Sequence, residues 1–270
     1  MAIVIAAGGT GGHIFPALAV ADAIRELRPD EHIVFIGVGN DLERQLICSR
    51  GYELQKIRFV ALAGKGLRGL LASLAALPRA LLQTLRLYRR LRPQVVLGFG
   101  GYPSFVPLLT AWLVRVPRIV HEQNVEVGLA NRVLALFGSR VFAVHGARGF
   151  WRSRGVRHLA NPVRRAFYDI PSWKSPKTGE RLRLLVIGGS QGAQSLNSAI
   201  LECLADWREL QLEIVHQTGS LDLARVSRGY QDAGWVDVQV SPFIEEMTEA
   251  YTRAQLVICR AGALTVAEVS

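Results

Sequence analysis

Apolar runs of strand length alternate with helical patterns along almost the whole chain, and no other feature constrains its fold as much. The run IVIAA, residues 3–7, is followed by the glycine turn GGTGG and by apolar residues at helical spacing. The same succession of strand, glycine turn and helix begins again near residue 182. Alternation of this kind is typical of parallel sheets whose two faces are covered by helices. The sequence therefore predicts an α/β protein with two doubly wound, Rossmann-like domains.

Other segments repeat this pattern. Helices are predicted at 41–50, which Gly51 is placed to end, and at 68–91, which Pro78 is expected to break. Pro16 is expected in the first turn of the helix that follows GGTGG. Further strands are predicted at 32–38, 93–99, 118–123, 140–145, 212–219, 236–244 and 256–259.

A segment rich in proline, serine and lysine, residues 170–183, indicates a linker or an exposed loop between the halves. We place the domain boundary before it, with domains 1–162 and 163–270. The last predicted helix starts near Ala263 and reaches Ser270 after about two turns. We therefore expect a truncated chain and an incomplete second domain.

The composition excludes several classes of protein. Half of the 270 residues are hydrophobic, so the chain can bury a sizeable core and is not a disordered polymer. It has no run near the roughly 18 consecutive apolar residues of a membrane span and no visible leader, so we expect a cytoplasmic protein. The distant Cys48, Cys203 and Cys259 are expected to be buried free thiols. The net charge of +10 favours an anionic partner, which could be nucleic acid, a membrane surface or a phosphorylated substrate.

Three glycine turns share one design: 8–12, 98–101 and 188–192, with a similar fourth turn at 261–265. Each follows a predicted parallel strand, and ligands of such sheets bind at the carboxyl ends of the strands. Backbone amides of glycine turns and the starts of helices favour anions such as phosphate. One such turn alone could serve only to bend the chain, and no complete nucleotide-binding fingerprint is present. Turns of this kind in both halves favour a phosphorylated ligand in a cleft between them.

Polar residues beside these turns are candidate site residues. A neutral imidazole at His13 could take a proton from a hydroxyl nucleophile, although a histidine there could also be a core residue. The segment HEQN, residues 121–124, ends a predicted strand and either forms part of the site or organises loops. Arg164 could pair with a phosphate or lie on the surface. Glu268 could bind a ribose diol or be an ordinary surface carboxylate.

Six segments together, in this order along nearly the whole chain, resemble the bacterial MurG family of glycosyltransferases: GGTGGHIFPALAVA, GFGGYPS, HEQNVEVGLANR, NPVR, GGSQGAQSLN and CRAGALTVAE. The resemblance implies a two-domain GT-B fold. It implies an inverting transferase that moves N-acetylglucosamine from UDP-N-acetylglucosamine to the 4-hydroxyl of undecaprenyl-pyrophosphoryl-N-acetylmuramyl-pentapeptide. This reaction converts lipid I to lipid II in peptidoglycan synthesis. The resemblance also implies no cofactor, no catalytic metal, and a peripheral location on the cytoplasmic face of the cell membrane.

The resemblance also implies roles for individual residues. His13 matches the family's candidate base, and Glu122 is a second candidate that could instead orient its neighbours. Residues expected to bind acceptor or donor are Thr10, Gly11 and Gly12 in the first turn, Tyr102 and Asn124 near it, Arg164 and Ser190 at the donor phosphates, Ile244 at the uracil, Ala263, Leu264, Thr265, Val266 and Ala267 at the start of the last helix, and Glu268 at the ribose.

The resemblance also makes the end of the chain unusual. Family members continue past the position of Ser270 with a segment that contacts the donor sugar, further strands and a terminal helix. We therefore expect exposed apolar surface and marginal folding in residues 165–270.

A stretch with many leucines and arginines and no acidic residue, 64–93, is either a core helix with a solvated basic face or a membrane-surface patch. The patch is favoured because leucines can enter the interface while cations meet anionic lipid. The stretch contains only Tyr88 for base stacking, so nucleic acid is not an expected partner. The residues expected in the patch are Leu70, Leu74, Arg79, Leu81, Leu85, Arg86 and Trp112.

Two alternatives to this function stay open. A related GT-B transferase could use another lipid acceptor, such as diacylglycerol. The chain could also be an inactive, truncated fragment that still associates with the membrane through its first domain.

Overall fold

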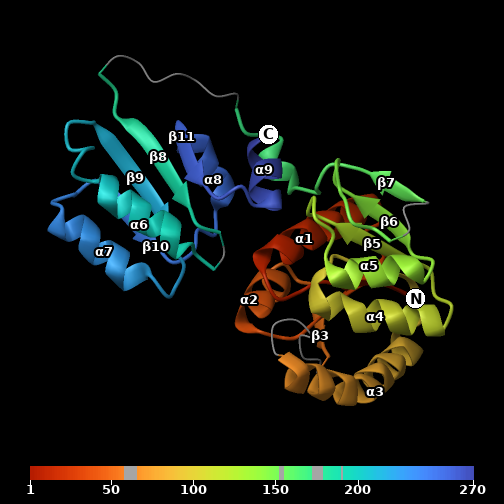
Figure 1. The fold of residues 1–270 in the computed structure, drawn as a ribbon. Helices are drawn as coiled ribbons and strands as arrows, with labels where there is room; N and C mark the ends of the chain where they lie inside the picture. The colour runs from red at the N-terminus through yellow and green to blue at the C-terminus, as the bar shows by residue number, and fades with distance from the viewer. Residues whose placement is uncertain (58–65, 152–154, 172–178, 190) are drawn as a thin grey trace. The chain divides into compact units, whose positions relative to one another are not determined.

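The computed structural model describes residues 1–57, 66–151, 155–171, 179–189 and 191–270, except for the side chains of residues 66–74. These residues form two compact units, Met1–Arg164 and Arg165–Ser270. Each unit has its own parallel sheet and its own hydrophobic core (Figure 1). The prediction of two doubly wound domains is therefore confirmed, and the second sheet is the smaller one.

The first unit is built on a seven-stranded sheet with the strand order β3-β2-β1-β4-β5-β6-β7. Strand β1 lies in the middle and pairs in parallel with both β2 and β4, so that Val4 lies opposite Val34 and Val96. All residues of β1 are buried, as expected for a strand covered on both faces. The strands are β1 (Ala2–Ala6), β2 (His32–Gly37), β3 (Glu53–Lys56), β4 (Pro93–Gly98), β5 (Arg118–Glu122), β6 (Arg140–Ala143) and β7 (Val156–His158).

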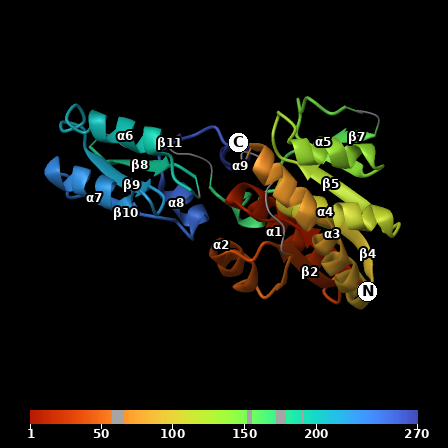
Figure 2. The same ribbon diagram turned by 60° about the horizontal axis from the view of Figure 1, so that its bottom comes forward.

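Helices cover both faces of this sheet. Ile3 and Ile5 pack with α1 on one face, whereas Val4 and Ala6 belong to the core under α3, α4 and α5 on the other. Figures 1 and 2 show α3, α4 and α5 side by side in that order. The helices are α1 (Gly11–Leu27), α2 (Asp41–Glu43) with the following π-helical segment η1 (Arg44–Cys48), α3 (Gly66–Leu91), α4 (Gly101–Leu113) and α5 (Leu129–Leu136).

The second unit has a four-stranded parallel sheet in the order β10-β9-β8-β11. Helices α6 and α7 cover the face that carries Leu184 and Ile214, and α8 lies on the opposite face. After the 3-10 turn η2 (Arg165–Phe167), the elements are β8 (Leu182–Ile187), α6 (Gln194–Cys203), β9 (Leu212–Gln217), α7 (Leu223–Asp232), β10 (Val238–Ser241), α8 (Met247–Arg253), β11 (Leu256–Cys259) and α9 (Ala263–Val269).

The structure corrects several details of the sequence analysis. Helix α3 runs unbroken through Pro78, which lies on its exposed side while Ala80 and Tyr88 anchor the helix to the core. Pro16 lies beyond the first turn of α1, because the helix already begins at Gly11. The expectation of three buried thiols is wrong, because Cys48 is exposed and Cys203 and Cys259 are only partly buried. The short strands β3 and β7 have few apolar residues, so their hydrophobic pattern gave no signal.

Helix α3 also corrects the expected membrane patch. Leu81 is partly buried and packs on the core, so it does not belong to the outward face. Its neighbour Leu82 is 46% exposed and shares the outward face with Arg79 and Arg86, because residues three and four apart lie on one side of a helix. Leu85 is half-buried, whereas the side chains of Leu70 and Leu74 lie outside the described residues. Trp112 at the end of α4 is 40% exposed, and its ring centroid lies 4.8 Å from that of Phe137.

In the described part of the chain, no helix is both long enough and apolar enough to cross a bilayer.

Because β1 lies in the centre of the sheet, we expect its side chains to contribute strongly to the free energy of unfolding of the first unit. Replacing the fully buried Ile5 with alanine should lower the free energy of unfolding of the first unit by about 2–5 kcal/mol, because it removes methyl groups and leaves a cavity. Leu27→Ala is the matched control, since Leu27 is 83% exposed. Urea denaturation measures both variants, and equal effects of the two would contradict the prediction.

Candidate functional site

A buried carboxylate holds the glycine turn that follows β1. Glu43 is fully buried, and its Oε1 accepts a hydrogen bond from the backbone N–H of Gly9 at 2.9 Å. Its Oε2 accepts another from the N–H of Gly39 at 2.6 Å, in the loop after β2. Glu43 was not among the residues predicted from the sequence. The pattern Asn40-x-x-Glu43 was an available signal, because it matches a helix-capping box, and the side chain of Asn40 does accept from the N–H of Glu43.

His13 lies in the first turn of α1 and packs on the turn that begins α4. A Cβ at Gly101, whose φ is +69°, would lie 3.2 Å from Cδ2 of His13. Only glycine combines this backbone conformation with such a close approach of the ring. Burial lowers the pKa of His13 below its usual value, while Gln123, Glu122 and the backbone of Phe99 oppose the shift. The imidazole is therefore neutral near pH 7, which is the form that can accept a proton.

Glu122 organises the loop after β5. Its Oε1 accepts from both the backbone N–H and the side-chain amide of Asn124, each at 3.0 Å. Its Oε2 accepts from the N–H of Gly128 and from the side chain of Asn131. A carboxylate with four donors around it is suited to fixing this loop. The geometry therefore favours the orienting role for Glu122 over that of a base.

The other predicted residues of the first unit lie around the same turns. Thr10 and Gly12 are exposed at the start of α1, whereas Gly11 is buried. Tyr102 is half-buried next to Gly9, and its pKa is raised by burial and by the nearby Glu43 carboxylate. The guanidinium carbon of Arg164 lies 5.1 Å from the ring centroid of Phe15 on α1. These residues all belong to Met1–Arg164, so the first unit alone brings them together.

In the second unit, loops from three neighbouring strands are joined at the carboxyl edge of the sheet. The N–H groups of Thr218 and Gly219, after β9, donate to the carbonyls of Ser241 and Pro242, after β10. The loop after β9 also packs on the turn after β8, where a Cβ at Gly192 would overlap the carbonyl oxygen of Thr218. With its φ of +78°, this position in the turn after β8 requires glycine. The predicted glycine turn is thus packed directly on the loop after β9.

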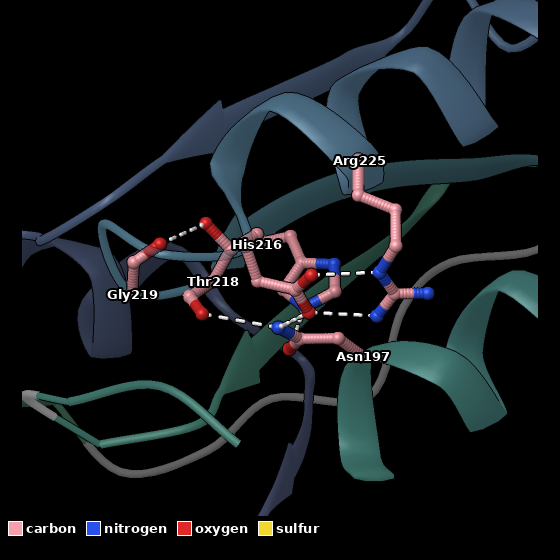
Figure 3. Close-up of polar contacts among 6 residues, drawn as sticks. Asn197, His216, Thr218, Gly219 and Arg225 are labelled. Carbon is pink, nitrogen blue, oxygen red and sulfur yellow. Dashed lines mark hydrogen bonds and ion pairs between the residues drawn. The ribbon is translucent and has the colours of Figure 1, made fainter. Parts of the chain in front are cut away.

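A buried polar network supports the loop after β9 (Figure 3). The side-chain N–H₂ of Asn197, in α6, donates to the carbonyl of Thr218 at 3.0 Å and to Asp222 at 2.7 Å. Its Oδ1 is therefore the acceptor for Nε2–H of His216 at 3.1 Å, and Nδ1 of His216 accepts from the hydroxyl of Tyr230 at 3.0 Å. Asp222 also binds Arg225. Sequence reasoning missed Asn197 and His216, because these partners lie far apart in the chain.

Among the predicted donor-binding residues of the second unit, Ile244 and Glu268 form hydrogen bonds within the protein. The backbone N–H of Ile244 donates to Oε1 of Gln217 at 3.0 Å. Ala263, Leu264, Thr265, Val266 and Ala267 lie on α9, which begins after the extended residue Gly262. Glu268 accepts a long hydrogen bond of 3.5 Å from the hydroxyl of Tyr251. Ser190 lies outside the described residues.

Within the described residues, no three His, Cys, Asp or Glu side chains are grouped so as to hold a metal ion. That the reaction needs no catalytic metal stays a prediction from the family resemblance.

Comparison with known proteins decides the family. The glycosyltransferase family 28 N-terminal domain matches residues 3–143, and the C-terminal domain of the same family matches residues 183–270. A crystal structure of MurG from Acinetobacter baumannii has a TM-score of 0.70 and 32% identity, over 99% of this chain and 75% of that one. The chain belongs to the MurG family.

Two relatives carry the full enzyme name, UDP-N-acetylglucosamine–N-acetylmuramyl-(pentapeptide) pyrophosphoryl-undecaprenol N-acetylglucosamine transferase. The protein from Alkalilimnicola ehrlichii is 46% identical over 272 residues, covering the whole of this chain and 75% of the relative. The protein from Anaeromyxobacter sp. (strain Fw109-5) is 44% identical over 278 residues, covering 71% of the relative. The predicted GT-B architecture of the MurG family is therefore confirmed.

The network around His216 makes the second unit sensitive to acid. Burial lowers the pKa of His216 to about 4, although Asp222 opposes the shift. Between pH 6.5 and 4 the unfolded chain binds a proton that the folded chain does not, so the free energy of unfolding falls as the pH falls through this window. The expected loss is about 3 kcal/mol at pH 4, and there is no contribution above pH 6.5.

Urea denaturation measures this dependence, followed by tryptophan fluorescence in a background where Trp112, Trp151 and Trp173 are replaced by phenylalanine, so that only Trp207 and Trp235 report. His216→Gln should lower stability at pH 7 and flatten its dependence on pH between 4 and 6.5. His145→Gln, which changes an exposed histidine of the first unit, is the control. An unchanged slope in His216→Gln would refute the assignment.

Proposed function

We propose that this chain transfers N-acetylglucosamine from UDP-N-acetylglucosamine to the 4-hydroxyl of lipid-linked N-acetylmuramyl-pentapeptide, which converts lipid I to lipid II in peptidoglycan synthesis. The observation that carries the proposal is the identity of 44–46% along the whole chain with relatives that are named for this transfer. The glycine turns at the carboxyl edge of each sheet support it, because a nucleotide-sugar donor and a pyrophosphate acceptor both present phosphates.

His13 is the proposed general base in the first unit. In the proposed step, the acceptor oxygen forms a bond to the anomeric carbon of N-acetylglucosamine while the bond from that carbon to the UDP oxygen breaks. The hydroxyl proton passes to the imidazole, and UDP leaves with the electron pair of the broken bond. Because attack occurs opposite the leaving group, the anomeric configuration inverts. The neutral state of the half-buried imidazole supports this role.

The donor is proposed to bind to the second unit and to Arg164. A guanidinium and backbone amides at the start of a helix stabilise the charge that develops on a departing diphosphate. Ser190 and residues Ala263–Ala267 are the proposed phosphate contacts. Ile244 is proposed at the uracil and Glu268 at the ribose diol. Thr10, Gly11, Gly12, Tyr102 and Asn124 are proposed to contact the acceptor and the sugar.

The outward face of α3 is proposed to bind the cytoplasmic surface of the cell membrane peripherally. Arg79, Arg86, Arg89 and Arg90 are all exposed on this helix, and Leu82 lies among them. The neighbouring helices α4 and α5 also end in exposed apolar residues, namely Trp112, Leu113 and Leu136. A mixture of cations and exposed leucine and tryptophan side chains suits the interface of an anionic bilayer.

The direct test is transfer of labelled N-acetylglucosamine by the purified chain to a lipid I analogue, with diacylglycerol as a second acceptor. Transfer to the lipid I analogue with release of UDP is expected. Transfer only to diacylglycerol would assign another acceptor, and no transfer to either acceptor would favour an inactive fragment.

His13→Ala should lower kcat by about 100-fold or more, the usual contribution of a positioned base, and change UDP affinity by less than about threefold. In the parent protein kcat/KM should fall on the acid side with an apparent pKa below 6.5, since His13 must be neutral and burial lowers its pKa. The exposed His145→Ala is the control. Unchanged turnover in His13→Ala, or an acid limb that survives in it, would contradict the role.

The double variant Arg79→Gln/Arg86→Gln should bind vesicles of phosphatidylglycerol and phosphatidylcholine about 30-fold more weakly, since each cation contributes about 1 kcal/mol near an anionic surface. Arg208→Gln/Arg228→Gln makes the same change in net charge on exposed residues of the second unit and should have little effect. Co-sedimentation measures both variants. Equal weakening by the two pairs would show that net charge, rather than α3, drives binding.

A further inference from the structure

Gln123 belongs to the segment HEQN, and the proposed mechanism gives it no role. It directly follows β5 and is only 3% exposed. The side chain of Asn161 donates to its backbone carbonyl at 3.1 Å. Nε2 of Gln123 donates to the carbonyl of Phe99, in the loop after β4, at 2.9 Å. These bonds hold Gln123 at the carboxyl edge of the sheet, beside the turn that begins α4.

The bond to Phe99 fixes the direction of the side-chain amide. A backbone carbonyl can only accept, so the N–H₂ group of Gln123 must face Phe99 and Oε1 must point elsewhere. Oε1 is buried, and within the described residues it forms no hydrogen bond of ordinary length and angle. A buried acceptor without a donor is costly, so a donor is expected next to it.

The imidazole of His13 lies next to this oxygen. A Cβ at Gly100 would lie 3.3 Å from Cε1 of His13 and 3.4 Å from Oε1 of Gln123, so the ring and the amide oxygen meet over the same glycine. Nδ1 of His13 is also buried, and none of the described residues gives it a hydrogen bond of ordinary geometry. Gln123 and the backbone of Phe99 both favour the protonated ring, as acceptors beside a ring N–H do.

The two nitrogens of the ring have different surroundings. Nδ1 is enclosed beside acceptors, namely Oε1 of Gln123 and the backbone of Phe99, so the hydrogen of the neutral ring is favoured on Nδ1. Nε2 lies over the start of α4, 3.3 Å from the place of a Cβ at Gly101, and is not enclosed as Nδ1 is. Because a neutral imidazole carries one hydrogen, Nε2 then keeps its lone pair.

We propose that Gln123 is a positioning residue for His13: its Oε1 accepts the hydrogen of Nδ1, holds the neutral ring in one tautomer, and leaves the lone pair of Nε2 to take the proton of the acceptor hydroxyl. When Nε2 takes up this proton the ring becomes positively charged, and the bond from Nδ1–H to Oε1 shortens and strengthens. No proton passes to Gln123. The inference rests on the proposed function, because it takes His13 as the base.

Nitrogen NMR of the whole chain labelled with ¹⁵N-histidine tests the tautomer directly, because protonated and unprotonated ring nitrogens differ in chemical shift. The signals of His13 are those that disappear in His13→Ala. Near pH 8, where the ring is neutral, the parent should carry the hydrogen on Nδ1. Gln123→Leu removes the acceptor at similar side-chain size, and the signals should move toward a mixture of both tautomers.

Turnover gives a second readout. Gln123→Leu should lower kcat by about tenfold, the size of one hydrogen bond to a charged group, and change each KM by less than about threefold. Burial lowers the pKa of His13 and Gln123 opposes this shift, so the acid limb of kcat/KM should move to lower pH in the variant. Glu122, the carboxylate that acts on His13 from β5, is unchanged in it. A merely structural role would not move this limb.

Gln123→Glu separates the acceptor of Gln123 from its donor. A carboxylate oxygen can still accept from Nδ1–H, whereas the donor to Phe99 is gone. The tautomer should therefore survive, and kcat should lie closer to that of the parent than to that of Gln123→Leu. Gln94→Leu is the matched control, because the half-buried Gln94 at the opposite end of the sheet also loses a hydrogen bond, to Glu31. Circular dichroism verifies the folding of each variant.

Three outcomes would overturn the inference. A hydrogen on Nε2 of His13 in the parent would contradict the tautomer. An unchanged tautomer in Gln123→Leu would show that the backbone of Phe99 suffices. Equal losses in Gln123→Glu and Gln123→Leu would show that the donor to Phe99 matters instead. Failure of the proposed function is distinguishable: His13→Ala would then turn over like the parent, although the parent showed the Nδ1–H tautomer and its dependence on Gln123.

Discussion

Parallel pairing of the strands is the constraint on which both units depend. Because all strands of a sheet run in one direction, their carboxyl ends lie at one edge, and each connection must cross back over a face. The faces are therefore covered by helices, which explains why all of β1 and the last four residues of β8 are apolar and buried. The same rule sends every loop that follows a strand to the same edge. Polar residues that are distant in the sequence become neighbours there.

Loops at such an edge have many backbone N–H and C=O groups that form no hydrogen bonds between strands. Single buried side chains form hydrogen bonds with these groups instead. Glu43 joins the loops after β1 and β2, and Gln217 joins those after β8 and β10. Glu122 closes the loop after β5 on itself. A buried polar group is costly unless it is hydrogen-bonded, so each of these side chains favours one arrangement of its loops over others. Rigid loops are what a site needs if its contacts must form without reorganisation.

The sequence was most informative where the signal is local. Strand β1, the turn after it and helix α1 follow directly from an apolar run, glycines and helical spacing. Helix α3 shows the limit of this reasoning. Leu81 and Leu82 are the same residue type, and only packing on the hydrophobic core decides which of them faces outward.

The site residues also divide into those with a local sequence signal and those that depend on distant partners. His13 was found because it adjoins a glycine turn, and the resemblance of six motifs gave the family. Glu43, Gln217 and the pair Asn197–His216 were missed. Apart from Gly39, which lies four residues from Glu43, their partners lie 14 to 34 residues away along the chain. A sequence pattern does not show which distant backbone amide a buried carboxylate or carboxamide will meet, because that depends on the order of the strands.

The carboxylate behind the first turn also divides GGTGG into two electrostatically different halves. Glu43 is fully buried and accepts from the N–H of Gly9, so this amide is not a free donor for an anion. The other side is the start of α1, where the helix dipole attracts negative charge. The turn is therefore polarised rather than uniformly receptive to phosphate.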